Sequence, residues 1–165
     1  MSMLRFAAAL LPLLAAPALA EPDHPAAHAA AGAPGQASPA PPNAHLYFIA
    51  PANGARLRGP VLVQFGLRGM GVTQAGSTAA QAGHHHLLVD SREPVAPGEP
   101  IPADKQHLHF GAGQTETNLD LPPGRHRLQL VLGDARHKPF APLVASRVIE
   151  VTVLPPARHR RVRRG

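Results

Sequence analysis

The sequence predicts an all-β domain, an immunoglobulin-like antiparallel β-sandwich of about seven strands. From His45 to Leu154, short runs of alternating apolar and polar residues are separated by turns rich in proline, glycine and asparagine. In that range no run of about ten residues has the 3.6-residue spacing of an amphipathic helix. Together these two observations favour short strands joined by turns.

The individual strands follow from the alternation of side chains along each run. In 61–67, the apolar residues Val61, Val63 and Phe65 share one face, which we expect to point into the core. In 126–132, after a Pro-Pro-Gly turn, alternate residues again give one apolar face. The expected strands in chain order are 46–49, 61–67, 84–90, 107–110, 115–121, 126–132 and 144–154.

The first 20 residues have the pattern of a cleaved secretory signal peptide. Arg5 gives the positive start, an apolar run follows, and Ala18-Leu19-Ala20 forms a small-residue cleavage site. Pro12 and Pro17 interrupt a run already shorter than the ~20 residues that a membrane span needs. We therefore expect a protein exported to the periplasm and not transmembrane after cleavage.

Three further segments are expected after the signal peptide. Residues 21–44 hold six prolines and nine alanines with almost no large apolar side chain, which is typical of a disordered linker. Residues 45–154 form the β-sandwich domain. Residues 155–165 carry five of the arginines behind the net charge of +6 and are expected to be a disordered basic tail.

Composition excludes several function classes. The chain has no cysteine, which excludes disulfides, thiolate metal sites and cysteine nucleophiles. Six aromatic residues, none of them tryptophan, offer little stacking surface for nucleic acid, and no nucleic-acid partner is expected. No nucleophile–base pair is evident, so we predict no enzymatic activity. The arginine tail is expected to make at most weak contact with anionic lipid headgroups or polysaccharide.

The eleven histidines are the candidate functional residues. His84 and His86 form one His-x-His pair, and His107 and His109 form another. In each pair the two imidazoles lie on one face of a strand, about 7 Å apart along it. We expect both pairs to face outward from the sandwich, although Leu88 shares the parity of His84 and a one-residue slip would instead turn His85 outward.

If the two strands are neighbours, their histidines can converge on one ion, because directly opposite Cβ atoms are only ~5 Å apart. Neutral imidazole suits Zn(II) or Cu(II), and a set without sulfur ligands argues against a dedicated Cu(I) site. No other cofactor is expected. The predicted ligands are His84, His86, His107, His109 and His137, and the second-shell or alternative ligands are Glu116, Asp134, Gln114 and His85.

Other interpretations of these histidines stay open. They can form a hydrogen-bonded polar patch with no ligand, and His126, which follows a Pro-Gly turn, is expected to play a structural hydrogen-bonding role. In that case the protein would be a non-enzymatic envelope module that binds a protein or an anionic polymer through a sandwich face or the basic tail. The physiological envelope partner is unknown under either interpretation.

Several motifs resemble an uncharacterised bacterial family, domain of unknown function 4399. They are residues 83–90 (GHHHLLVD), residues 107–111 (HLHFG) and residues 113–117 (GQTET). The resemblance runs from about His45 to Leu154 and implies an exported, histidine-rich single β domain without an established activity. The family usually ends its last motif with Pro-His, whereas this chain has Pro139-Phe140.

Overall fold

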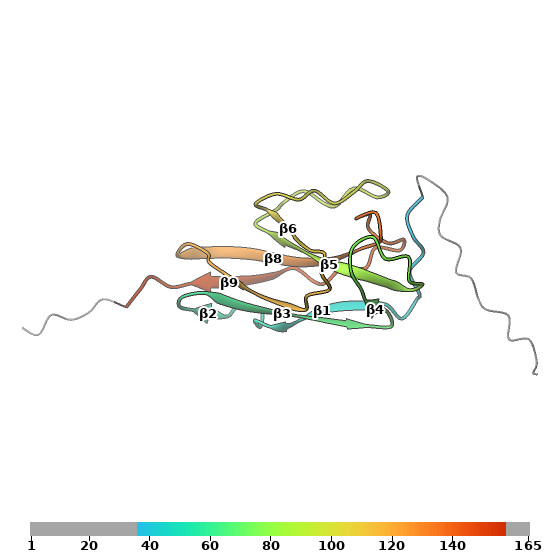
Figure 1. Cartoon of the computed structure of the whole chain (residues 1–165). Coiled ribbons are helices and arrows are strands. Elements are labelled where there is room, and N and C mark those ends of the chain that lie inside the picture. The colour runs from blue at the N-terminus through green and yellow to red at the C-terminus, as the bar shows by residue number, and fades with distance from the viewer. Residues whose placement is uncertain (1–35, 158–165) are drawn as a thin grey trace, which may run out of the picture.

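The computed structural model describes residues 36–157, and within that range the chain is all-β, with nine strands and no helix (Figure 1). This confirms the predicted all-β class. The strands are β1 (His45–Ala50), β2 (Arg56–Leu57), β3 (Val61–Arg68), β4 (Gly71–Val72), β5 (Ala82–Val89), β6 (His107–Phe110), β7 (Glu116–Leu119), β8 (Gly124–Gly133) and β9 (Ile149–Val153).

The strands form two sheets. One has three strands in the order β1-β3-β7, and the other has six, in the order β2-β9-β8-β5-β4 with β6 also paired to β5. The pairings β2–β9 and β4–β5 are parallel, and the other pairings in both sheets are antiparallel. Figure 1 shows the two sheets stacked, with β6, which pairs with β5 in the six-stranded sheet, on the side away from β1 and β3.

The main core lies between the two sheets. The three-stranded sheet contributes residues such as Val63 and Phe65, and the six-stranded sheet contributes residues such as Leu87, Leu128 and Leu130. Each large aliphatic side chain buried in this way stabilises the fold by roughly 1.5–3 kcal/mol. The alternation predicted for the strands at 61–67 and 126–132 is therefore the alternation that builds the core.

A smaller apolar cluster covers the opposite, outer face of the six-stranded sheet. Leu88 and Val131 from the sheet pack there against Ile101, which comes from the connection between β5 and β6. Every residue of β5 from Gly83 to Val89 is buried as a result. The predicted outward exposure of His84 and His86 is therefore wrong: both side chains are 0% exposed.

Some expected boundaries shift. The last strand begins at Ile149 rather than at 144, because residues 144–148 run beside β8 irregularly and make only an isolated bridge there, between Ala145 and Val131. β7 is shorter than the predicted 115–121. β2 and β4 have two residues each, which is too short for an alternation pattern to show.

Residues 38–41, assigned to the linker by composition, lie against the domain. The Ala40 amide donates to the Ala141 carbonyl (2.9 Å), and the Ala141 amide donates to the Ser38 carbonyl (2.9 Å). The expected signal peptide, residues 21–35 and residues 158–165 of the basic tail fall outside the described residues. Between residues 36 and 157, no helix is long and apolar enough to cross a membrane.

Candidate metal centre

Four imidazoles gather on the outer face of the six-stranded sheet, and they belong to His84, His86, His109 and His137. The six distances between their ring centroids range from 4.8 to 6.0 Å. We call this set the histidine cluster. It joins three segments that are far apart in sequence: β5, β6 and the turn after β8.

Strand register brings these three segments together. His84 and His86 are two residues apart on β5, so they share a face. In the β5–β6 ladder His86 pairs with His109, and in the β5–β8 ladder His84 pairs with Gly133, the last residue of β8. The turn that carries His137 therefore begins directly beside His84.

Two glycines leave the space that the cluster occupies. A Cβ on Gly133 would lie 2.7 Å from His86 Nε2 and 3.5 Å from His84 Nε2. A Cβ on Gly111 would lie 2.3 Å from His109 Cε1. Glycine is thus required beneath the rings for steric reasons. Neither glycine was predicted to belong to the site. The available signal was a glycine at or just after the end of a strand that neighbours a histidine-rich strand.

Asp134 folds the turn that presents His137. Its Oδ1 accepts hydrogen bonds from the amides of Arg136 and Lys138 (2.9 Å each), and its carbonyl accepts one from the His137 amide (2.9 Å). His137 adopts a φ of +65°, a left-handed conformation that histidine visits more readily than β-branched residues. Asp134, a predicted alternative ligand, therefore supports the turn, and both its oxygens already accept hydrogen bonds.

The distances suit a single ion. Ligand atoms of His84, His109 and His137 all lie within 4.8 Å of one another, and His84 Nε2 is 3.1 Å from His86 Nε2. A tetrahedral ion with metal–nitrogen bonds of ~2.0–2.1 Å holds its ligand atoms roughly 3.4 Å apart. Small rotations of the exposed ring of His109 and the half-buried ring of His137 would bring them to that spacing.

The chemistry of the donors also fits a metal. All four are imidazoles, which Zn(II) and Cu(II) accept. The Nδ1 atoms of His84 and His86 are buried and have no hydrogen-bond partner among the described residues. Unpartnered buried polar atoms are rare in folded proteins and often mark a functional site.

The environment keeps the buried histidines neutral. Burial, followed by the nearby imidazoles of His137 and His109, lowers the pKa of His84 to about 4. Burial and the rings of His84 and His109 lower the pKa of His86 to about 3. Burial and His137 also lower the pKa of His109. Because only neutral imidazole binds metal, these three are in the ligating form at pH 7.

His107, a predicted ligand, does not join the cluster. It pairs with Leu88, two residues further along β5 than His86, and its Nδ1 lies 2.9 Å from Asp104 Oδ1. The two strands run antiparallel, and the only histidines that pair across them are His86 and His109. His107, the other histidine of β6, therefore lies further from His84. His137, which was also predicted as a ligand, comes from a turn and supplies the fourth imidazole of the cluster.

The other predicted second choices also lie outside the cluster. Glu116 lies on the three-stranded sheet, where it accepts a hydrogen bond from Gln64 Nε2 (2.9 Å). His85 points to the core side, against Phe65 (ring centroids 5.0 Å apart), and donates from Nδ1 to the carbonyl of Gln114 (3.1 Å). Its partner Gln114 therefore supports His85 and not the cluster.

His126 has the structural role that the sequence predicted. Its Nδ1 lies 2.8 Å from Asp90 Oδ2, and its Nε2 lies 2.8 Å from the carbonyl oxygen of Pro122. Asp90 follows β5, while His126 lies near the start of β8. The histidine thus ties the end of one strand to the beginning of its neighbour.

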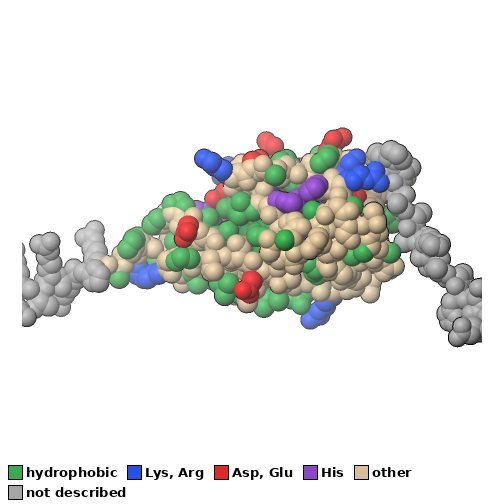
Figure 2. All heavy atoms as spheres, in the orientation of Figure 1, with side chains coloured by type: hydrophobic (Ala, Val, Ile, Leu, Met, Phe, Trp, Pro, Cys, Tyr) green, Lys and Arg blue, Asp and Glu red, His purple; other side chains and the backbone are tan. Residues whose placement is uncertain are grey.

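The cluster is open on one side. His84 and His86 are fully buried, His137 is half-buried and His109 is exposed. Figure 2 shows histidine side chains at the surface above the six-stranded sheet, near the level of β6 in Figure 1. The cluster therefore meets solvent at the ring of His109.

Residues 63–154 match the family described as Domain of unknown function (DUF4399). The chain belongs to this family. The match contains β5, β6, β8 and the turn with His137, so all four histidines of the cluster lie inside the DUF4399 domain.

No curated protein matches this DUF4399 chain. Among solved structures it is similar to the X-ray structure of the endo-beta-1,4-mannanase from Thermotoga petrophila, at 17% identity and a TM-score of 0.39. The alignment covers 67% of this chain and 20% of that one, so this chain spans about a fifth of the mannanase. A likeness of this size carries no argument about activity.

Proposed function

We propose that this DUF4399 protein binds a divalent transition metal, Zn(II) or Cu(II), through His84, His109 and His137, with His86 as the fourth ligand. The observation that carries the proposal is the approach of three ligand atoms to within 4.8 Å from three separate segments of the chain. Three neutral imidazoles on β5 and β6 add the correct charge state. When bound, the ion would supply a cross-link between β5, β6 and the turn after β8.

The ligand set favours reversible binding rather than catalysis. With four imidazoles an ion would have a complete tetrahedral shell, whereas catalytic zinc sites keep one position open. Of the carboxylates near the cluster, Asp134 is occupied in folding the turn. We therefore propose a non-enzymatic role in holding or handing over metal. The solvent exposure of the His109 ring would set the affinity for the ion.

We infer that this role is carried out in the periplasm. The support is the signal-peptide pattern of residues 1–20, together with an all-imidazole site that needs no reducing environment. Export would bring the protein into an oxidising compartment in which zinc and Cu(II) are available to histidine ligands. The partner that supplies or receives the metal is a further expectation, for which the arginine tail offers only a weak surface.

We also infer that the fold is immunoglobulin-like. The order β1-β3-β7 corresponds to strands A, B and E of such domains, and the order β9-β8-β5 corresponds to strands G, F and C. The core between the two sheets supports the same assignment. The metal cluster would then lie on the outer face of the sheet that contains strands G, F and C.

The direct test is a competition titration with Zn(II) and Cu(II) against a chromogenic chelator, using the tag-free protein. We expect one ion per chain. The double variant His109→Ala/His137→Ala should lower the affinity at least 100-fold, since two of the four proposed ligands are lost and neither side chain is fully buried. His107→Ala is the matched control, because it removes a histidine of the same strand that lies outside the cluster, and it should bind as the wild type does.

A titration without these effects would favour the interpretation of the histidines as a polar patch that binds no metal. If the wild type binds metal weakly and the double variant binds it equally well, the proposal is contradicted. The alternative, an envelope module that binds a protein or an anionic polymer, would then be favoured. Deletion of residues 155–165 separates the two further, because it should leave metal binding intact and remove any tail-mediated contact with an anionic polymer.

A further inference from the structure

Residues 38–41 cross the turn that carries His137, and we call them the arm. The arm is joined to the segment after that turn by two backbone hydrogen bonds, from Ala40 to Ala141 and from Ala141 to Ser38. Pro39 and Ala141 form a parallel bridge. These contacts place a segment from before the first strand against the structure that presents a metal ligand.

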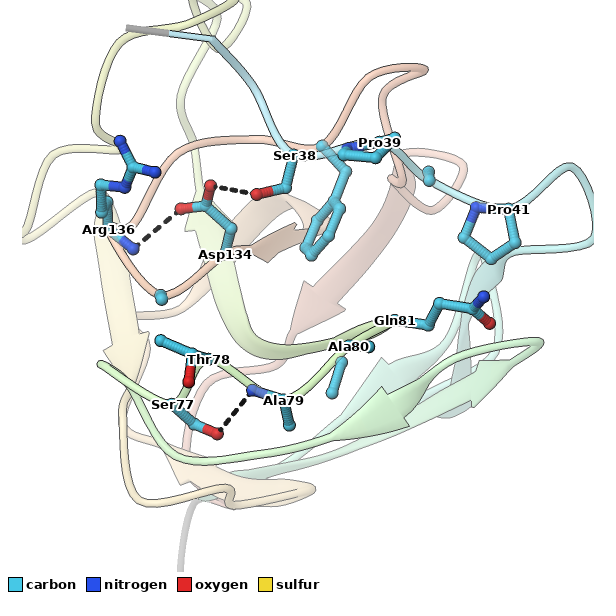
Figure 3. Close-up of a pocket in the computed structure, with 14 residues that line it drawn as sticks. Ser38, Pro39, Pro41, Ser77, Thr78, Ala79, Ala80, Gln81, Asp134 and Arg136 are labelled. Carbon is cyan, nitrogen blue, oxygen red and sulfur yellow. Dashed lines mark hydrogen bonds between the residues drawn. The ribbon is translucent and has the colours of Figure 1, made fainter. Parts of the chain in front are cut away.

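Asp134 connects the arm to the turn. Its Oδ2 accepts a hydrogen bond from the Ser38 hydroxyl (2.8 Å), and its Oδ1 accepts one from the Arg136 amide (Figure 3). Oδ1 also accepts a hydrogen bond from the Lys138 amide. Asp134 is 4% exposed, so these partners replace water around the carboxylate. One oxygen therefore holds the arm, and the other holds the loop in which His137 lies.

The backbone of His137 needs such support. Its φ of +65° is uncommon for a residue with a side chain, and such conformations persist when surrounding contacts fix them. The His137 carbonyl accepts a hydrogen bond from the Ile101 amide (2.8 Å), and its amide donates to Asp134. The turn is thus fixed from the β5–β6 connection on one side and by Asp134 on the other.

The arm is held by hydrogen bonds and by the packing of Ala40 against the main core. A hollow of about 300 Å³ separates the arm from residues 77–82 on the facing loop, as Figure 3 shows. The lining is mostly small side chains, including those of Pro39, Ala80 and Ala135. Segments beside a hollow open more easily than the core does, and the bond from Ser38 to Asp134 is the side-chain contact that holds the arm to the turn.

We propose that the arm acts as a strap that positions His137, so that metal affinity depends on its attachment through Ser38 and Asp134. This inference rests on the proposed metal function and adds the regulation of that site. Ser38 and Asp134 are positioning residues: neither binds the ion. Anything that draws the N-terminal segment away from Asp134 would loosen the turn and weaken the hold of the protein on its metal.

The test uses full-length protein and three variants. Ser38→Ala removes the hydroxyl, Ser38→Thr keeps it, and Ser77→Ala removes a hydroxyl that lines the same hollow but bonds to the Ala79 amide instead. Two quantities are measured: the zinc affinity by chelator competition, and the hydrogen exchange of the Arg136 and Lys138 amides in metal-free protein.

We expect Ser38→Ala to speed exchange at both amides and to weaken zinc binding about 3- to 10-fold, as the loss of one hydrogen bond of ordinary strength predicts. Ser38→Thr should restore both values, and Ser77→Ala should change neither. The exchange measurement needs no metal, so it reports on the strap separately from the metal function.

Unchanged zinc affinity in Ser38→Ala would overturn the inference, even with faster exchange, because the strap would then stabilise the turn without affecting the site. Failure of Ser38→Thr to restore affinity would also overturn it. A wild-type protein that binds no zinc would overturn the proposed function and the strap's link to metal with it. In that case faster exchange in Ser38→Ala would show that the hydrogen bond from Ser38 to Asp134 does support the turn and that only the proposed metal binding is wrong.

Discussion

Gly133 shows how much of the cluster depends on one position without a side chain. The residue ends β8, and the rings of His84 and His86 lie over its Cα. Its φ is not in the left-handed region, so the requirement for glycine is one of space rather than of backbone freedom. A substitution at Gly133 can therefore displace the ligand rings without removing any of the four histidines.

Gly133→Ala should lower zinc affinity at least tenfold. The added Cβ would lie 2.7 Å from His86 Nε2, so that ring must move away from the position it shares with His84. Overpacking of this kind typically costs about 1–3 kcal/mol, so a moderate loss of thermal stability should accompany it. Zinc competition and calorimetry check both effects.

Gly71→Ala is the control for this substitution. Its added Cβ would make only an ordinary contact, 3.5 Å from the Ala82 Cβ, in the neighbouring strand β4. It should bind zinc as the wild type does. Wild-type affinity in Gly133→Ala would mean that His86 takes no part in the site.

For the single strand β5, the alternation of apolar and polar residues predicted which side chains share a face but not which face is exposed. Parity along 84–90 correctly separated Leu87, Val89 and His85 from His84 and His86. Exposure did not follow from parity, because two irregular segments cover the second face. Residues 91–106 and 134–148 have no periodic pattern, and their contacts with β5 depend on the tertiary fold.

An ion pair between His126 and Asp90 lies at the end of the β5–β8 pair that is away from the histidine cluster. Burial alone would lower the pKa of His126, but its hydrogen bonds to Asp90 and Pro122 and the charge of Asp90 outweigh burial and raise it. Both ring nitrogens face acceptors, so the doubly protonated ring satisfies both contacts. The stabilisation is therefore fully present below the unfolded pKa of about 6.5 and is lost as pH rises through the raised folded value.

His126→Gln should accordingly reduce the free energy of unfolding more at about pH 6 than at about pH 9. An amide can donate to one acceptor but cannot replace the charge. Urea denaturation at the two pH values gives the difference, and His45→Gln, an exposed histidine on β1, serves as the control. An equal loss at both pH values would show that His126 acts through packing and not through its charge.

For the whole molecule, composition and alternation were sufficient to predict the all-β class and a histidine-rich site, but not the shape of that site. The overlap of His86 with His109 follows from local patterns once β5 and β6 are paired. His137 was predicted as a ligand, but the position of its turn beside His84 depends on the β5–β8 register and on Asp134. The exclusion of His107 depends on the β5–β6 register. These features are set by long-range contacts, as is the position of Ser38, which the linker composition concealed.

The most direct test of the account is X-ray absorption spectroscopy of the full-length protein loaded with one equivalent of zinc. We predict a first shell of three to four nitrogens at ~2.0–2.1 Å with the outer-shell scattering of imidazole rings. That scattering should fall in His109→Ala and stay unchanged in His107→Ala. A shell of oxygen atoms without imidazole scattering, or a spectrum that His109→Ala leaves unchanged, would contradict the claim that the histidine cluster is a metal site.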